Sequence, residues 1–210
     1  ELHYEVEYQV VNCPDYGVPQ HRKRLVLLAS RFGEIHLIPP LYDAEHYITV
    51  RDAIGHLQPI EAGEICPNDI LHRSSALSAI NMERIQQSVP GGTWRDWDEN
   101  LRLKCHKKES GATFPSVYGR MEWDEPSPTM TTQFYGYGNG RFGHPEQNRA
   151  ISLREGAILQ SFPDDYVFID DQHPAKKREL GTHIGNAVPV ELGRAIGMSI
   201  QQHLAEMGVN

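Results

Sequence analysis

The sequence predicts an α/β protein, and three segments indicate this fold class. Residues 4–10 alternate between apolar and polar side chains, as in a strand with one buried face. Residues 24–30 form a short apolar run that is typical of a second strand. Near the C-terminus, residues 189–207 carry apolar side chains at helical spacing, with Pro189 at a position typical of a first helical turn.

The two N-terminal strands are expected to pair as a hairpin. Residues 14–17 (Pro-Asp-Tyr-Gly) supply the turn chemistry between them. Because two strands alone are marginal in water, we expect the hairpin to lie at the edge of a larger sheet.

The middle of the chain is expected to be less regular. Helical spacing at residues 50–57 and 78–85 predicts two short helices. Residues 114–142 are rich in Gly, Tyr and Thr, which predicts loops and short strands. A further helix is expected at residues 152–162, because Ser152 begins a capping-box spacing.

Composition and charge narrow the class of protein. The net charge of −8 argues against a protein that binds nucleic acid over its whole surface. Basic clusters at residues 21–24, 102–108 and 176–178 are still compatible with a local basic face. Each cluster could equally be solvated surface charge. The sequence has no apolar stretch long enough for a membrane helix and no secretory leader, so a cytoplasmic location without membrane contact is expected.

The cysteines and histidines do not indicate a metal centre or a disulfide framework. Cys13, Cys66 and Cys105 lie far apart without a Cys-x-x-Cys pair. The eleven histidines show no spacing typical of metal ligands. We therefore expect no protein-bound metal.

Three motifs resemble those of DNA cytosine-5 methyltransferases. The first motif, residues 16–24 (YGVPQHRKR), has the Tyr-Gly-x-Pro turn followed by the family's Gln-x-Arg-x-Arg pattern. The second motif, residues 148–155 and 159–166, is similar to the family's penultimate motif. The third motif, residues 184–189 (IGNAVP), is similar to its last one. The order is that of the family, with a long variable segment after the first motif.

The resemblance implies a fold and a division into domains. Residues 1–52 and 183–210 would be edge strands and the C-terminal helix of a Rossmann-like S-adenosylmethionine-dependent methyltransferase domain. Residues 53–158 would be a small, irregular α+β target-recognition domain, and residues 159–182 a hinge. The implied function is methylation of carbon 5 of cytosine in duplex DNA, as in restriction-modification.

The chemistry of the family gives the first motif its expected role. Such enzymes add a cysteine thiolate to carbon 6 of cytosine, and the charge that enters the ring needs cationic hydrogen-bond donors. By resemblance, Arg24 and Arg22 face the flipped cytosine and its backbone, while Gln20 orders the loop. Alternatively, Arg22 and Lys23 are simply exposed residues at a strand start.

The target base must leave the DNA stack to be methylated, so DNA contacts are expected in the target-recognition domain. Residues 126–132 resemble the family's short threonine-containing signature, best matched at Thr131-Thr132. The glycine-rich residues 135–140 could carry binding side chains or could be a solvent loop. Arg and Gln can make bidentate bonds to bases. The candidate DNA contacts are Thr131, Thr132, Gln133, Tyr135, Tyr137, Arg120 and Arg141.

The third motif bears on the cofactor. In the family, this segment completes the S-adenosylmethionine pocket, so Asn186, Ala187 and Val188 are the implied cofactor-binding positions. The alternative is a simple turn before a helix that begins at Pro189.

Parts of the family's active site do not occur in this sequence. The glycine-rich cofactor loop, the Pro-Cys nucleophile and the Glu-Asn-Val acid precede the Gln-x-Arg-x-Arg motif in the family. Cys13 stands in Asn-Cys-Pro order, so we interpret it as a small buried residue. We expect an isolated chain to be inactive and to need an N-terminal catalytic half, either in the same polypeptide or as a separate subunit. The alternative is a stand-alone DNA-binding module.

Overall fold

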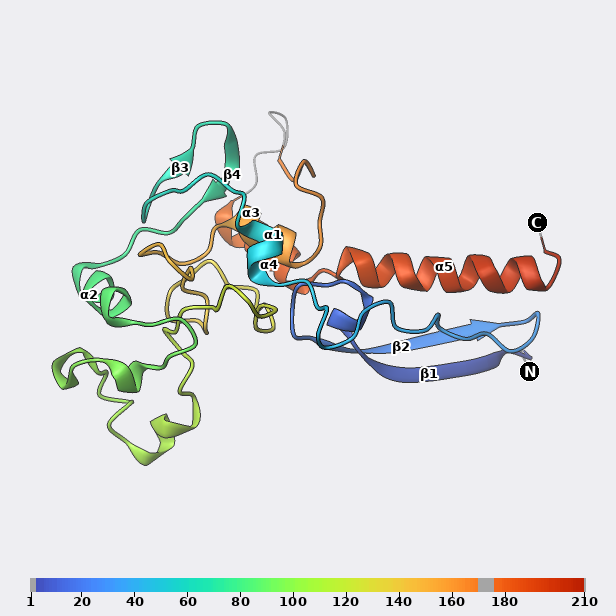
Figure 1. Ribbon diagram of the computed structural model, residues 1–210, viewed down its shortest axis with the longest axis horizontal. Helices are drawn as coiled ribbons and strands as arrows, with labels where there is room; N and C mark the ends of the chain where they lie inside the picture. The colour runs from blue at the N-terminus through green and yellow to red at the C-terminus, as the bar shows by residue number, and fades with distance from the viewer. Residues whose placement is uncertain (1–2, 170–175, 210) are drawn as a thin grey trace.

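The chain folds into a long arm and a broader body (Figure 1). The computed structural model describes residues 3–169 and 176–209. In the arm, strands β1 (Glu5–Asn12) and β2 (Lys23–Ser30) lie alongside helix α5 (Val190–Glu206), and both ends of the chain lie at the arm's tip. A 3-10 turn, η1 (Cys13–Tyr16), follows β1. Helices and strands together give an α/β fold, as predicted.

The predicted hairpin is confirmed. Strands β1 and β2 pair antiparallel, from Glu5 opposite Ser30 to Asn12 opposite Lys23. One face of the hairpin packs on α5. Its core also contains Cys13, which is fully buried, and burial raises the pKa of this thiol to about 11. Cys13 is therefore a core residue, as interpreted from the sequence. The core residues of the arm are Val11, Cys13, Tyr16, Val18, Val26, Leu28, Ile35, Leu37, Leu192 and Ala195.

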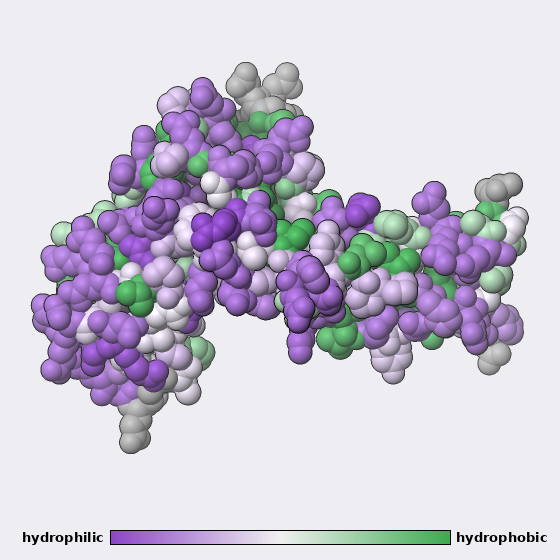
Figure 2. All heavy atoms as spheres, viewed as in Figure 1, coloured by the Kyte–Doolittle hydropathy of each residue, from purple (hydrophilic) through white to green (hydrophobic). Residues whose placement is uncertain are grey.

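The other face of the hairpin is apolar and exposed. Tyr8 is 70% exposed and Val10 is 66% exposed, although both stand in a regular strand. Figure 2 shows hydrophobic side chains at the surface of the arm. Within the described residues this sheet has two strands, so the larger sheet expected from the sequence is not formed there. The exposed apolar face comprises Tyr4, Val6, Tyr8, Val10, Leu25 and Leu27.

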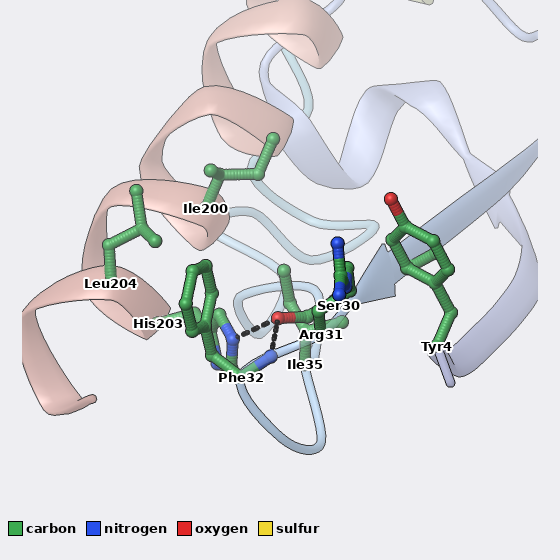
Figure 3. Close-up of a pocket in the computed structure, with 9 residues that line it drawn as sticks. Tyr4, Ser30, Arg31, Phe32, Ile35, Ile200, His203 and Leu204 are labelled. Atoms are coloured by element: carbon green, nitrogen blue, oxygen red, sulfur yellow. Dashed lines mark hydrogen bonds between the residues drawn. The ribbon is translucent and has the colours of Figure 1, made fainter. Parts of the chain in front are cut away.

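A hollow of about 460 Å³ lies at the tip of the arm, between the end of β2 and α5 (Figure 3). Beside it, His203 of α5 and Ser30 of β2 are joined by a hydrogen bond of 2.7 Å between Nε2 and Oγ. The backbone N–H of Phe32 also donates to this Oγ at 3.0 Å. Ser30 and His203 therefore satisfy each other's hydrogen-bonding groups, and their bond links β2 to α5.

The body contains short elements around a separate core. The helices expected near residues 50–57, 78–85 and 152–162 are confirmed at slightly different bounds. Residues 114–142 form loops, as predicted, but only isolated β-bridges occur where short strands were also expected. The hairpin β3–β4 and helix α4 were not predicted. The elements of the body are α1 (Val50–Ile54), β3 (Ile65–Cys66), β4 (Asp69–Arg73), α2 (Ala79–Gln87), η2 (Trp94–Asp96), η3 (Glu99–Leu101), η4 (Glu109–Thr113), α3 (Leu153–Leu159) and α4 (Lys177–Asn186).

The boundaries expected from the sequence at 52/53, 158/159 and 182/183 do not fit these elements. They cut through α1, α3 and α4, respectively. All three helices contribute to one core around the fully buried Phe134, so each belongs to the body as a whole unit. The arm and body instead divide at the segments 39–49 and 187–189.

A buried ion pair anchors α3 in the body. Arg149 is 0% exposed and donates to both carboxylate oxygens of Glu155 at 2.7 Å. The same carboxylate accepts the N–H of Ser152 at 2.6 Å, and the Ser152 hydroxyl accepts the N–H of Glu155 at 3.0 Å. These reciprocal bonds are the capping box predicted from the sequence. Burial alone would raise the pKa of Glu155, but Arg149 lowers it to about 2.

The body is expected to lose stability when the pH falls from about 6.5 towards 4. Burial lowers the pKa of His144 from its usual 6.5 to about 4, so the ring is neutral at pH 7 despite lying 3.7 Å from Glu155. Because the folded-state pKa is depressed, this stability is fully present above 6.5 and decreases through the window by up to about 1.4 kcal/mol per pH unit. Urea unfolding across this range measures it. His144→Asn, which cannot titrate, should flatten the dependence, and an unchanged slope would contradict the assignment.

Candidate active-site junction

Gln20 of the first motif lies at the centre of the junction between arm and body. Its side chain is fully buried. The Nε2 group donates to the carbonyl of Leu159 at 3.1 Å and to Oε1 of Gln160 at 3.2 Å, while its Oε1 accepts the N–H of Met130 at 2.9 Å. Gln20 therefore joins the first motif to the end of α3 and to the threonine segment at residues 126–132.

Arg22 is buried in the same junction rather than exposed. It is only 5% exposed, and its Nη groups donate to the carbonyls of Met130 at 3.2 Å and Gly185 at 3.4 Å. The expected direct contact with a flipped cytosine does not fit this burial, because these carbonyls would lose their donor. The alternative of an exposed strand start fits Lys23, which is exposed, but not Arg22.

Arg24 is the more accessible arginine of the first motif. It is partly buried at the start of β2, and Nη1 donates to the carbonyl of Lys23 at 2.7 Å. In the described part of the chain its guanidinium makes no other hydrogen bond. Most of its donors therefore remain available to a ligand.

Two glycines let α4 pack closely on the threonine segment and the residues that follow it. A Cβ on Gly185 would lie 2.4 Å from the carbonyl oxygen of Thr131, and one on Gly181 would lie 2.2 Å from the ring of Tyr135. Real Cβ atoms do not approach other atoms this closely. The two glycines stand one helical turn apart, so a single face of α4 makes both approaches.

Gly185→Ala is expected to destabilise the chain by about 1–3 kcal/mol, because the new methyl group meets backbone that cannot rotate away. Urea unfolding measures the loss. The matched control is Gly193→Ala in α5, where nothing lies within 4 Å of the added Cβ. There the better helix propensity of alanine should stabilise by about 0.5–1 kcal/mol. Equal effects at both positions would contradict the packing argument.

The third motif contains the connector between α4 and α5 (residues 186–188). Asn186 is exposed at the end of α4, Ala187 is partly buried, and Val188 is 62% exposed. Within the described chain, the side-chain amide of Asn186 and the backbone N–H of Val188 make no hydrogen bond. This donor set fits the polar methionine end of S-adenosylmethionine. It also agrees with the alternative of a turn, since Pro189 is the N-cap of α5.

Side chains that could meet a ligand lie at the end of the threonine segment and in the residues directly after it. Thr131 and Gln133 are exposed, whereas Thr132 and Tyr135 are partly buried. The ammonium group of Lys177 lies 5.1 Å from the centre of the Tyr135 ring, and burial, helped by the like charge of Arg73, lowers its pKa to about 8. Lys177 was seen in the sequence only as part of a basic cluster.

Comparison with known proteins identifies the family. C-5 cytosine-specific DNA methylases, as a family, match residues 1–202. The chain belongs to this family. It is 56% identical, over 97% of its length, to the type II methylase M.HgiDII of Herpetosiphon aurantiacus. It is 36% identical, over 95% of its length, to the type II methyltransferase M1.HphI of Haemophilus parahaemolyticus.

The chain spans about half the length of these relatives, covering 57% of the first and 48% of the second. A DNA modification methyltransferase encoded in an Escherichia coli prophage has a similar fold. The TM-score is 0.68 at 20% identity, and the match covers 96% of this chain and 61% of that protein.

Arg120 and Tyr137 do not fit the expected DNA contacts. Arg120 is 5% exposed, and its guanidinium donates to the carbonyls of Ser88, His144, Gln147 and Ile85, all within 2.8 Å, and to Asn148. Tyr137 is 8% exposed, and its hydroxyl bonds to the Ser88 hydroxyl at 2.9 Å. Both side chains hold loops of the body together.

Arg141 is a candidate DNA contact with a buried, unused donor. It lines a hollow of about 340 Å³ beside His21 of the first motif and the threonine segment. Its Nη1 is buried and has no hydrogen-bond partner in the described part of the chain.

Within residues 3–169 and 176–209, no group of His, Cys, Asp or Glu side chains could hold a metal ion, and no helix is long and apolar enough to cross a membrane.

Proposed function

We propose that this chain is the base-holding and DNA-recognition portion of a DNA cytosine-5 methyltransferase. The observation that carries the proposal is the junction, where three motifs far apart in the sequence meet through direct hydrogen bonds. Gln20 of the first motif bonds Gln160 of the second, and Arg22 bonds the carbonyl of Gly185 in the third. Such a junction would place a base-holding arginine and a cofactor-binding connector in one rigid unit.

Arg24 would contact the flipped cytosine or its adjacent phosphate. A cationic fork with free donors stabilises negative charge as it enters the pyrimidine ring. Gln20 and Arg22 would support this contact indirectly, since their side chains bond protein groups in the junction.

The connector at residues 186–188 would hold S-adenosylmethionine, which supplies an electrophilic methyl group. Asn186 would donate through its side-chain amide and Val188 through its backbone N–H, with Ala187 packed beside them. The side chains that would contact duplex DNA are Thr131, Thr132, Gln133, Tyr135 and Arg141. Arg120 is not among these contacts, because its burial keeps it from a ligand.

The N-terminal catalytic half would cover the exposed apolar face of the β1–β2 hairpin. This face extends over both strands and includes Tyr8 and Leu27, which pair with each other. Exposed patches of this kind mark interaction surfaces. The relatives' additional length also supports a further segment that contributes the nucleophilic cysteine and the acidic residue.

The test is methyl transfer from labelled S-adenosylmethionine to cytosine-containing duplex DNA. The chain is assayed alone and after mixing with the N-terminal half encoded with it. We expect transfer only from the mixture. DNA binding by the chain with no transfer from the mixture would instead favour a stand-alone DNA-binding module, and transfer by the chain alone would overturn the need for a second half.

A further inference from the structure

Two residues at the end of α3 hold both ends of the connector between α4 and α5. On the α4 side, Nε2 of Gln160 donates to the carbonyls of Ile184 at 2.9 Å and Gly185 at 3.2 Å. Gln160 is fully buried, so no water can replace these bonds. The last turn of α4 is therefore fixed by a side chain from another helix.

On the α5 side, the same two residues accept the first N–H groups of the helix. The N–H of Val190 donates to the carbonyl of Gln160 at 3.2 Å, and that of Glu191 donates to Oγ of Ser161 at 3.0 Å. The N-cap residue of α5 is Pro189, whose side chain cannot cap. Ser161 supplies the missing cap from a distant part of the sequence.

The backbone of Ser161 adopts a conformation that is unusual for its residue type. Its φ is 59°, in the left-handed region where a side chain costs about 1 kcal/mol. In this conformation its hydroxyl donates to the carbonyl of Gln160 at 2.7 Å while accepting from Glu191. Strain that is retained at such a position suggests that its geometry serves a purpose.

We propose that Gln160 and Ser161 are positioning residues that clamp the connector in its cofactor-binding conformation. The inference rests on the proposed function, because it assigns the connector to S-adenosylmethionine. The clamp fixes the two helix ends and leaves Asn186 and Val188 between them. Oε1 of Gln160 also accepts a hydrogen bond from Nε2 of Gln20, so the clamp and the first motif belong to one hydrogen-bonded unit.

Gln160→Met tests the clamp, since it keeps the side-chain length and removes the amide. In the enzyme joined to its N-terminal half, we expect the dissociation constant for S-adenosylmethionine, measured by calorimetry, to rise about tenfold. The turnover number at saturating cofactor should fall by a smaller factor than the affinity, because Gln160 reaches the base-holding residues only through its bond to Gln20. In the chain alone, amide hydrogen exchange should become faster at Ala187, Val190 and Glu191, whose N–H groups are hydrogen-bonded in the folded chain.

Ser161→Gly is the second variant, because glycine removes the hydroxyl and tolerates the left-handed backbone. It should speed exchange at Glu191 and weaken cofactor binding even if Gln160→Met folds poorly. Gln147→Met is the matched control. Oε1 of Gln147 accepts two hydrogen bonds inside the body, from Ile60 and Arg149, far from the connector in sequence. This control should lose stability with unchanged cofactor affinity.

The outcomes separate the two proposals. If the wild-type enzyme neither binds S-adenosylmethionine nor methylates DNA, the proposed function fails. If the wild type binds it, but Gln160→Met and Ser161→Gly keep wild-type affinity and wild-type exchange at Ala187, Val190 and Glu191, the clamp is overturned. Exchange in the chain alone decides whether the two residues hold the connector, independently of methyl transfer.

Discussion

Glu155→Gln is expected to lower the free energy of unfolding by about 3–5 kcal/mol. The substitution leaves the guanidinium of Arg149 charged, fully buried and without its carboxylate partner. A buried charge without a counter-charge carries a large desolvation penalty. The hydrogen bond from the N–H of Ser152 to this side chain also weakens, so the N-terminus of α3 is less well capped.

Equilibrium unfolding in urea, followed by tryptophan fluorescence, measures this loss. Asp124→Asn is the matched control, because Arg51 donates to both oxygens of Asp124 at 2.7 and 3.1 Å in an exposed pair that is also bidentate. Exposed pairs are screened by water and contribute little to stability, so this control should lose much less than Glu155→Gln. Similar losses in the two variants would show that burial does not determine the strength of the Arg149–Glu155 pair.

Arg24→Ala is expected to reduce the turnover number of the reconstituted enzyme by about 10²- to 10³-fold, if Arg24 stabilises charge on the cytosine. Cofactor affinity should stay unchanged, because Arg24 lies outside the connector. Arg24→Lys should recover only part of the rate, since an ammonium group lacks the planar fork. Single-turnover methyl transfer and cofactor calorimetry measure the two quantities.

Lys23→Ala, at the adjacent exposed position, is the control and should retain most of the rate. Arg22→Ala should behave differently again. Its main cost should be stability, because the carbonyls of Met130 and Gly185 lose their buried donor. A loss of turnover at Lys23 equal to that at Arg24 would indicate a general charge effect instead of a specific contact.

Elements defined by local patterns could be predicted from the sequence. The alternation in β1, the helical spacing of α5 and the capping box at Ser152 each depend on residues close together in the chain. Helix α4 could not be predicted in this way, because Gly181 and Gly185 weaken its intrinsic helix propensity. It is stabilised by packing on the segment from Thr131 to Tyr135, which is distant in sequence.

The site was predictable in its motifs but not in the burial of its residues. The sequence alone does not distinguish the roles of Arg22, Arg24 and Arg120. Each of these arginines could be expected to contact DNA. Only the fold shows that carbonyl groups from distant loops surround Arg120 and that Arg22 reaches Gly185. Gln160 was overlooked because a glutamine after a helix has no distinctive pattern, although it lies within a recognised motif.

The arm is built from the two ends of the chain, and this has a consequence for the order of folding. Leu28 and Leu192 share one core, yet nearly the whole body lies between them in sequence. Closing such a long loop is entropically costly unless the intervening chain is already compact. The body should therefore fold first and bring α5 to the hairpin last. During synthesis, the face of the hairpin that packs on α5 must therefore stay uncovered until that helix has been made.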